Sequence, residues 1–246
     1  MPTFDLRLLQ RLPWLQPRRQ CQLCDEVTDH PTHSICTACE AELPWLGAHC
    51  RLCAVPLPAQ GMICGACQNK PPSFSRVEAP WRYAFPVDNL ITRFKHQGQW
   101  PYGRLLAELL AEHLLHAYDE GLPRPQAMLP VPLARRRQRQ RGFNQAQMLA
   151  DWLGAIVQLP VHNDWLRRRV DTPAQQGLDA ATRKRNLRQA FSLELQAGVA
   201  GAHLALVDDV LTTGATAGML AHLLRRAGAQ RVDVYCLART PRPGDG

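Results

Sequence analysis

The sequence contains no long apolar run and no N-terminal stretch typical of a secretory signal. Asp5, Arg7 and Arg11 interrupt the leucine-rich first 15 residues, whereas a signal peptide keeps its central region free of charge. No apolar segment approaches the roughly 20 residues that a transmembrane helix needs. We therefore expect a cytoplasmic protein without a membrane span, whose first residues form a short amphipathic helix.

Acidic residues are scarcer than basic ones, with 21 Asp and Glu against 29 Lys and Arg in 246 residues. Residues 1–70 contain six of each charge, so the whole basic excess lies in residues 71–246. An excess of this kind suits an anionic ligand, either a diphosphate or a nucleic acid, and does not choose between them. Hydrophobic residues make up 46% of the chain, which excludes a disordered protein and provides a core for one or two domains.

Eight of the nine cysteines form Cys-x-x-Cys pairs near the N-terminus. The pairs are Cys21 and Cys24, Cys36 and Cys39, Cys50 and Cys53, and Cys64 and Cys67. Two such pairs supply the four thiolates of a tetrahedral zinc site. Because a cytoplasmic protein keeps its thiols reduced, we expect two structural zinc ions rather than disulfides. The first two pairs should form one site and the last two the other, although spacing alone also permits an interleaved arrangement.

One stretch combines a buried strand, two acids and a small-residue loop. Leu204–Val207 is apolar throughout, which is typical of a strand buried on both faces, and Asp208 and Asp209 follow at once. A helix is predicted from Thr216 to Ala227, with Gly228 as its stop. The stretch between the acids and this helix is rich in threonine. Its last residues, which lead into the helix start, are Thr212, Thr213, Gly214, Ala215 and Thr216.

This order of residues suits a ligand that carries a phosphate beside two neighbouring hydroxyl groups, such as a ribose 5-phosphate. The loop ends at a helix N-terminus, which favours a phosphate, and Asp208 and Asp209 can accept hydrogen bonds from the hydroxyls. The alternative is a strand followed by a capped helix, with Asp and Thr serving only turn chemistry. The stretch resembles the phosphoribosyl-diphosphate (PRPP) loop of type I phosphoribosyltransferases, in which four apolar residues, two acids and a Thr-Thr/Ser-Gly-x-Thr turn occur in this order.

Basic clusters offer partners for a diphosphate. Five arginines occupy seven positions from residue 135 to residue 141, directly after a predicted strand at 128–132. Arginine makes bidentate contacts with phosphate oxygens, so Arg135, Arg136 and Arg137 are candidate ligand contacts. The polar region 171–190 adds Lys184 and Arg185, where phosphoribosyltransferases carry a mobile loop that closes over the diphosphate. An exposed basic turn and a charged linker are the respective alternatives.

Further motifs make the chain similar to the ComF/GntX family. They are the cysteine pairs, Phe94–Gly98, Arg-Gly-Phe-Asn-Gln at 141–145, Gln176, Arg185–Asn186, Phe191 and the acidic pair with its loop. The resemblance implies an α/β domain at 71–240 with a mostly parallel sheet and helices on both faces. A double zinc ribbon of four-cysteine sites at 1–70 would precede it, and a loose tail at 241–246 would follow.

The resemblance also implies a role in DNA uptake or utilisation during natural competence, and it leaves the chemistry open. In one hypothesis the chain is a phosphoribosyltransferase that binds PRPP with magnesium, uses Asp208 and Asp209 at the ribose, and transfers the sugar phosphate to an unidentified acceptor. In the other it is a non-catalytic protein that binds single-stranded DNA through its zinc ribbon and arginine clusters. A competence helicase and other DNA-uptake proteins are the expected partners.

Overall fold

The computed structural model of the chain describes residues 19–168, 190–194 and 198–241. The chain forms two compact units that divide between Leu43 and Pro44. The predicted N-terminal helix, and nearly all of the predicted tail, lie outside the described residues. The domain boundary predicted after residue 70 stays a prediction, and the last two Cys-x-x-Cys pairs lie within the larger unit.

The smaller unit is built from turns and one short helix, α1 (Thr37–Ala41). An antiparallel bridge joins Gln20 to Val27 and closes the turn that carries the first cysteine pair. Asp29 anchors the helix start, because its carboxylate accepts hydrogen bonds from the Thr37 amide at 2.9 Å and the Thr37 hydroxyl at 2.6 Å. A unit of this size cannot bury a large core, so it depends on cross-links such as a metal ion.

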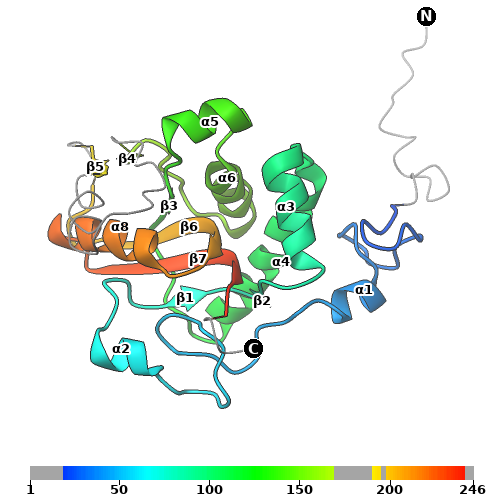
Figure 1. The fold of residues 1–246 in the computed structure, drawn as a ribbon, viewed down its shortest axis with the longest axis horizontal. Coiled ribbons are helices and arrows are strands. Elements are labelled where there is room, and N and C mark those ends of the chain that lie inside the picture. Colours follow the sequence, from blue (N-terminus) through cyan, green and yellow to red (C-terminus); the bar gives the residue numbers. More distant parts are fainter. Residues whose placement is uncertain (1–18, 169–189, 195–197, 242–246) are drawn as a thin grey trace, which may run out of the picture. The chain divides into compact units, whose positions relative to one another are not determined.

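The larger unit is organised around a five-stranded sheet (Figure 1). Its strands are β1 (Val77–Glu78), β2 (Trp81–Arg82), β3 (Ala127–Pro130), β6 (His203–Leu211) and β7 (Arg231–Arg239). The order is β1-β7-β6-β3, with β2 pairing farther along β7, and every ladder is parallel. β1 and β2 together act as one interrupted edge strand. Two further strands, β4 (Leu166–Arg168) and β5 (Phe191–Leu193), form a separate antiparallel pair.

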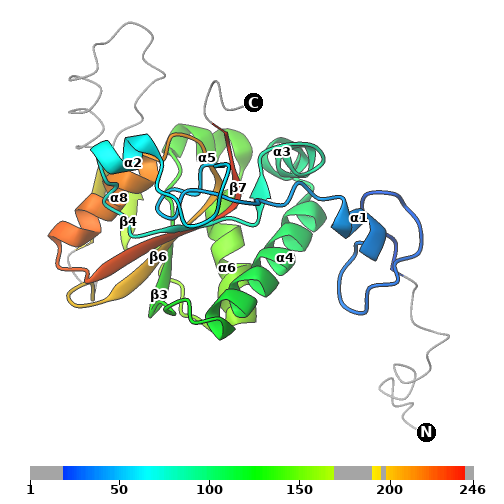
Figure 2. The same ribbon diagram turned by 90° about the horizontal axis from the view of Figure 1, so that it is seen from below.

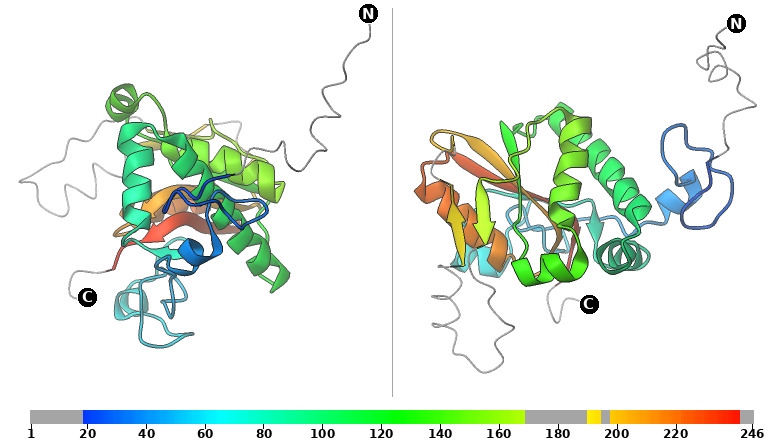
Figure 3. Two further views of the ribbon diagram at one scale, coloured as in Figure 1. Left: turned by 90° about the vertical axis from the view of Figure 1, so that its right-hand side faces the viewer. Right: turned by 90° about the horizontal axis from the view of Figure 1, so that it is seen from above.

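Helices cover both faces of the sheet, which confirms the predicted fold class (Figures 2 and 3). On one face lie α4 (Trp100–Asp119) and α6 (Gln145–Val157), preceded in the chain by α3 (Val87–Gln97) and α5 (Arg135–Arg141). On the other face lies α8 (Ala215–Arg226), and α2 (Gly65–Asn69) is found on the same side. Of the helices in the part of the chain described, none is both long and apolar enough to cross a membrane.

The core follows the apolar patterns of the sequence, with one difference in strand length. Leu204, Ala205, Leu206 and Val207 are at most 1% exposed, as expected for a strand covered on both faces. The predicted strand 204–207 is too short, however, because β6 continues to Leu211. Pairing with β7 extends it, since Leu211 is still in register with Arg239. The sequence predicts a helix from Gln145 to Val157 with Asn144 as a candidate N-cap, and α6 spans the same residues.

Candidate functional site

A polar cavity of about 620 Å³ lies at the carboxyl ends of β3 and β6, and we term it the carboxylate cavity. Its walls come from α3, α5, the starts of α6 and α8, β4, and the ends of β3 and β6. The lining residues are Lys95, His96, Val131, Pro132, Leu133, Arg137, Gln140, Arg141, Gln145, Arg168, Asp208, Asp209 and Thr216. Most of these side chains are charged or amide-bearing, so the cavity suits a polar ligand.

The topology of the sheet explains why a cavity forms here. β3 and β6 are neighbours, but the chain leaves β3 toward α6 on one face and leaves β6 toward α8 on the opposite face (Figure 2). The loops after the two strands therefore diverge and leave a crevice between them. In open α/β sheets ligands bind at such a switch point, outside the carboxyl ends of the strands.

Two adjacent carboxylates form the floor of the carboxylate cavity. Asp209 is 4% exposed, and its Oδ2 lies 2.7 Å from Nζ of Lys95 near the end of α3. Its other oxygen, Oδ1, accepts a hydrogen bond from the Val210 amide at 2.7 Å, while Oδ1 of Asp208 accepts one from the Asp209 amide at 2.9 Å. Each carboxylate is thus oriented by the strand itself, and Lys95 neutralises one of the two charges.

The surroundings of Asp208 disfavour the ionised form of its carboxyl group. Burial of its carboxyl group, together with repulsion from Asp209, raises the pKa of Asp208 to about 8, against the lowering effects of the Asp209 amide and Lys95. The raised pKa favours the protonated form of Asp208 at neutral pH, beside the ion pair of Asp209 and Lys95. A ligand that needs both carboxylates ionised must displace a proton from Asp208.

Helix α5 directs basic side chains into the same cavity. Arg137 and Arg141 are four residues apart, so they lie on one side of the helix. Arg141 donates a hydrogen bond to the side chain of Gln145. Burial lowers the pKa of His96, and repulsion from Arg141 and Lys95 lowers it further. His96 is therefore neutral at pH 7, while the arginines and Lys95 supply a positive field for an anion.

The threonine-rich loop joins β6 to α8. Gly214 precedes the first helical residue with a φ of 71°, in the left-handed region that glycine adopts without strain. The hydroxyl of Thr213 accepts a hydrogen bond from the amide of Ala215 at 3.3 Å. Thr216 faces the carboxylate cavity, whereas Thr212, Thr213 and Gly214 line a second cavity of about 860 Å³, which we term the loop cavity.

Asn144 connects the strand end of β3 with the start of α6. Its side-chain oxygen accepts a hydrogen bond from the amide of Ala146 at 3.1 Å and caps the helix, as its position before residue 145 predicts. The Nδ2 group of Asn144 donates to the carbonyl oxygen of Val131 at 3.2 Å. One side chain thus fixes the helix start against the wall of the carboxylate cavity, which positions Gln145.

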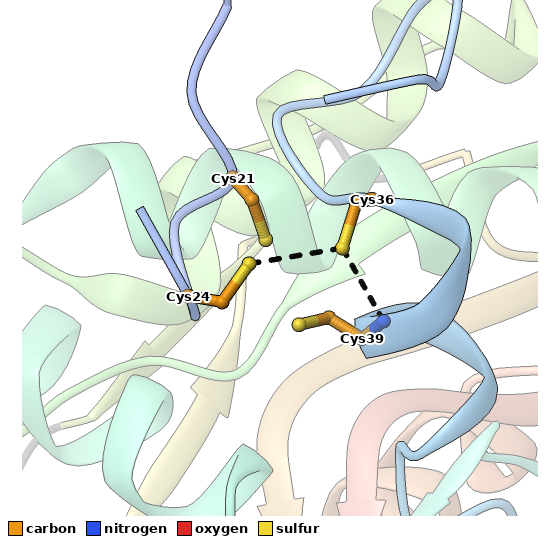
Figure 4. Close-up of side chains that lie close together, drawn as sticks. All are labelled: Cys21, Cys24, Cys36 and Cys39. Atoms are coloured by element: carbon orange, nitrogen blue, oxygen red, sulfur yellow. Dashed lines mark hydrogen bonds between the residues drawn. The ribbon is translucent and has the colours of Figure 1, made fainter. Parts of the chain in front are cut away.

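The first cysteine cluster lies in the smaller unit. The sulfur atoms of Cys21, Cys24, Cys36 and Cys39 face one centre and lie within 4.8 Å of one another (Figure 4). The sulfurs of Cys24 and Cys36 are 3.8 Å apart. In a tetrahedral site with zinc–sulfur bonds near 2.3 Å, the sulfurs are about 3.8 Å apart. The donor set therefore fits zinc.

The second cluster repeats this arrangement in the larger unit, with Cys50, Cys53, Cys64 and Cys67 within 4.8 Å of one another and all four buried. The turns that carry the two clusters are alike. Asp25 and Ala54, each four residues after the first cysteine of its cluster, both have a left-handed backbone with φ of 61° and 55°. The structure thus groups the cysteines as two four-cysteine sites in sequence order, compatible with two structural zinc ions.

Known proteins with similar sequences cover almost the whole chain. It is 37% identical over 225 residues to the "DNA utilization protein YhgH" of Salmonella typhi, covering 89% of this chain and 96% of the relative. It is 35% identical over 209 residues to "Competence protein F" of Haemophilus influenzae, covering 84% and 91%. The chain belongs to the ComF/GntX family. A family model described as a double zinc ribbon domain also matches residues 11–68 of this ComF/GntX member.

Among solved structures, a purine phosphoribosyltransferase from Pyrococcus horikoshii matches the ComF/GntX chain with a TM-score of 0.34 and 16% identity. The match covers 55% of this chain and 70% of that one.

The structure brings together part of the site that the ComF/GntX sequence predicts. Asp208, Asp209, Thr216 and Arg137 line the carboxylate cavity, whereas Arg136 is exposed and is not among the lining residues. Ala215 is the first residue of α8, and Arg135 is the first residue of α5. Lys184 and Arg185 lie outside the described residues.

Several lining residues were not among the predicted site residues. They are Lys95, His96, Gln140, Arg141, Gln145 and Arg168. The prediction selected the consecutive residues Arg135, Arg136 and Arg137. A helix over 135–141 places residues 137 and 141 on one side, so helical spacing would have indicated Arg141 as well. For Lys95 the sequence offered only an even choice between a solvated helix residue and a phosphate contact.

Proposed function

We propose that this chain binds PRPP with magnesium in the carboxylate cavity and acts in the uptake or utilisation of DNA. The DNA role is drawn from the names of the relatives. The ligand is drawn from one observation: a carboxylate pair, a set of basic side chains and a helix N-terminus meet in a single cavity of about 620 Å³. PRPP carries two hydroxyl groups, a 5-phosphate and a diphosphate, and each has a chemical counterpart there.

The residue roles follow from the chemistry of each group. Asp208 and Asp209 accept hydrogen bonds from the ribose hydroxyls, and the ordered backbone of β6 holds them in place. Thr216 and the main-chain N–H groups at the start of α8 hold the 5-phosphate. Thr212, Thr213 and Gly214, which line the loop cavity, and Ala215 are further candidates. Arg137 and Arg141 bind the diphosphate, with Arg135, Arg136, Lys184 and Arg185 as further candidates. Magnesium binds chiefly through oxygens of the ligand and water.

Transfer of the sugar phosphate is the reaction that such a complex supports, with an acceptor still to be identified. As the bond to the diphosphate breaks, the ribose ring gains positive charge, which a neighbouring carboxylate stabilises. The leaving diphosphate gains negative charge, which Arg137, Arg141 and magnesium stabilise. The catalytic candidates are therefore Asp208 and Asp209, and the arginines bind the leaving group.

A calorimetric comparison of partial ligands tests this division of the site. Ribose 5-phosphate and inorganic diphosphate, each with magnesium, are titrated into wild type, Asp208→Asn/Asp209→Asn and Arg137→Gln/Arg141→Gln. The asparagine variant should lose more affinity for ribose 5-phosphate than for diphosphate. The glutamine variant should lose more affinity for diphosphate than for ribose 5-phosphate. Arg104→Gln on α4 serves as the control, because Arg104 pairs with Glu108 on the outside of the helix. Equal losses in both variants would refute the assigned roles.

A second candidate function is the binding of single-stranded DNA without catalysis. One observation favours it in addition to the names of the relatives: the indole of Trp100 is 54% exposed and lies edge-on to Phe143, directly after the arginines of α5. Exposed aromatic rings beside cationic side chains stack on bases of a single strand. The two functions overlap at the arginines of α5, which would contact the diphosphate of PRPP in one and the phosphates of DNA in the other.

The salt dependence of DNA binding tests this second candidate. Binding of a fluorescent oligothymidine should weaken with salt by about 0.7 log units per log unit for each phosphate neutralised. Trp100→Ala should weaken it at every salt concentration, whereas Arg104→Gln should change it less than Arg137→Gln. Binding that is insensitive to salt, or equal in Trp100→Ala and wild type, would exclude this surface.

A further inference from the structure

One buried arginine connects the second cysteine cluster with the threonine-rich loop. Arg239 is the last residue of β7 and is 3% exposed. Its Nε donates a hydrogen bond to the carbonyl oxygen of Cys53 at 2.8 Å. Its Nη1 donates to the carbonyl oxygens of Leu211 at 2.9 Å and Thr212 at 2.6 Å, and also to that of Thr240. A single guanidinium therefore holds the main chain of the cluster and the main chain of the loop.

Apolar packing also joins the cluster and the loop, because Cys53, Cys67, Phe74 and Leu211 belong to one buried hydrophobic core. The loop cavity, about 860 Å³, is lined by Cys53 and Cys67 of the cluster, by Thr212, Thr213 and Gly214 of the loop, and by Arg239. Arg239 adds directional hydrogen bonds to this packing, because it donates to the carbonyl oxygen of Cys53 and to those of Leu211 and Thr212.

The chemistry of arginine suits this position. A guanidinium carries five N–H donors in a rigid planar fork, so it can bind carbonyl groups on two sides at once. A charged donor bonded to a carbonyl in a buried site is stronger than a neutral one, and its loss leaves buried oxygens without a partner. Lysine carries its charge on a single nitrogen, so it cannot donate hydrogen bonds to the carbonyl oxygens of Cys53 and Leu211 in the two directions that the guanidinium uses.

We propose that Arg239 is a positioning residue that makes the shape of the threonine-rich loop depend on zinc at the second cysteine cluster. This inference rests on the proposed function, because it is that function that gives the loop a ligand. Coordination of zinc by Cys53 would fix the main chain of that residue, whose carbonyl oxygen accepts a hydrogen bond from the guanidinium. The guanidinium then holds the carbonyls of Leu211 and Thr212, so that the following N–H groups face a phosphate.

Reciprocal effects follow from this connection. If zinc at the second cluster strengthens PRPP binding, PRPP must strengthen zinc binding there by the same factor. The second four-cysteine site then supports the ligand loop, in addition to its contribution to folding. Within the second cluster, the hydrogen bond that Arg239 donates goes to the carbonyl oxygen of Cys53.

Hydrogen exchange at residues 211–216 tests the dependence on zinc without any ligand. The two clusters provide a matched pair of variants, Cys67→Ser in the second and Cys39→Ser in the first, each of which removes one thiolate from one zinc site. We expect loop exchange to become about tenfold faster in Cys67→Ser, as for the loss of one charged hydrogen bond, and to be unchanged in Cys39→Ser. Equal loop exchange in Cys67→Ser and wild type would overturn the proposal.

Arg239→Lys provides a second test that leaves all eight cysteines in place. It should retain two zinc ions by metal analysis, accelerate exchange of the loop, and raise the Kd for magnesium-PRPP about tenfold. Arg231→Lys at the start of β7 is the control, because Arg231 pairs with Asp233 away from the loop. Wild-type exchange in Arg239→Lys would refute the coupling. If wild type binds no PRPP while loop exchange still depends on Arg239 and zinc, the proposed function is wrong and the coupling stands.

Discussion

The ion pair between Lys95 and Asp209 should stabilise the fold measurably, and Lys95→Met removes its charge while keeping most of the side-chain stem. The Nζ and Oδ2 atoms are 2.7 Å apart, and the side chains of Lys95 and Asp209 are 23% and 5% exposed. The substitution leaves a buried carboxylate without its cation, next to the second carboxyl group of Asp208. We therefore expect a loss of stability larger than that of a surface pair.

The size of the loss can be bounded from the geometry. Two unit charges about 4 Å apart attract by about 4 kcal/mol at an effective dielectric constant near 20, before the cost of desolvation. Removing one partner of a fully buried pair costs about 3–5 kcal/mol. Because a part of the Lys95 side chain reaches solvent, we expect about 2 kcal/mol, which lowers the Tm of a unit of this size by about 4–8 °C.

Calorimetric or circular-dichroism melting at pH 7.5 measures this effect against a matched exposed pair. Arg167 pairs with Glu194, and their side chains are 57% and 44% exposed, so Arg167→Met should cost less than about 1 kcal/mol. A double-mutant cycle of Lys95→Met with Asp209→Asn isolates the pairwise contribution. A cost of Lys95→Met no larger than that of Arg167→Met, or additive effects of the Lys95 and Asp209 substitutions, would show that the pair does not stabilise the fold in this way.

Three further predictions concern Asp208, Gly214 and Asn144. The pKa of Asp208 is raised to about 8, and hydrogen bonds from the ribose hydroxyls require its ionised form. PRPP affinity should therefore rise with pH, by up to about tenfold per pH unit, from pH 7 to pH 8 and then level off. Calorimetry at several pH values measures this, and it would show no such rise if Asp208 were already ionised. Gly214→Ala should cost about 1–2 kcal/mol in thermal unfolding through its left-handed backbone, since the nearest ring atom of Phe74 leaves room for a methyl group at 3.7 Å; an unchanged Tm would contradict this. Asn144→Ala should cost about 1 kcal/mol or more through the lost helix cap, whereas Asn144→Asp should restore most of the loss in the same melts.

Local signals in the sequence predicted the central part of this fold. The apolar run before Asp208, the glycine at the loop and the helix that follows were each identified from residue type and spacing alone. The Cys-x-x-Cys spacing likewise predicted two four-cysteine clusters, because each pair is a tight turn. The spacing favoured grouping in sequence order but also permitted an interleaved arrangement, and the structure has the sequence order. Asn144 was recognised as a cap because capping depends on residues only two or three positions away.

The remaining features depend on contacts between distant residues or on segments without an apolar pattern. The helix over 135–141 consists only of arginine and glutamine, so no apolar periodicity marks it. The extension of β6 to Leu211 comes from pairing with β7. Lys95 meets Asp209 across more than 100 residues of sequence, and Arg239 meets Cys53 across 186. Spacing along the chain carries no information about such contacts.

Binding of PRPP in the carboxylate cavity is the proposal on which the other roles of this site depend. Calorimetric titration of magnesium-PRPP into the zinc-loaded chain tests it most directly, with Asp208→Asn/Asp209→Asn measured beside wild type. We predict saturable binding of one PRPP per chain to wild type, and no detectable binding to the double variant that melts normally and retains its zinc. Absence of binding to wild type, or equal binding to both proteins, would contradict the proposal.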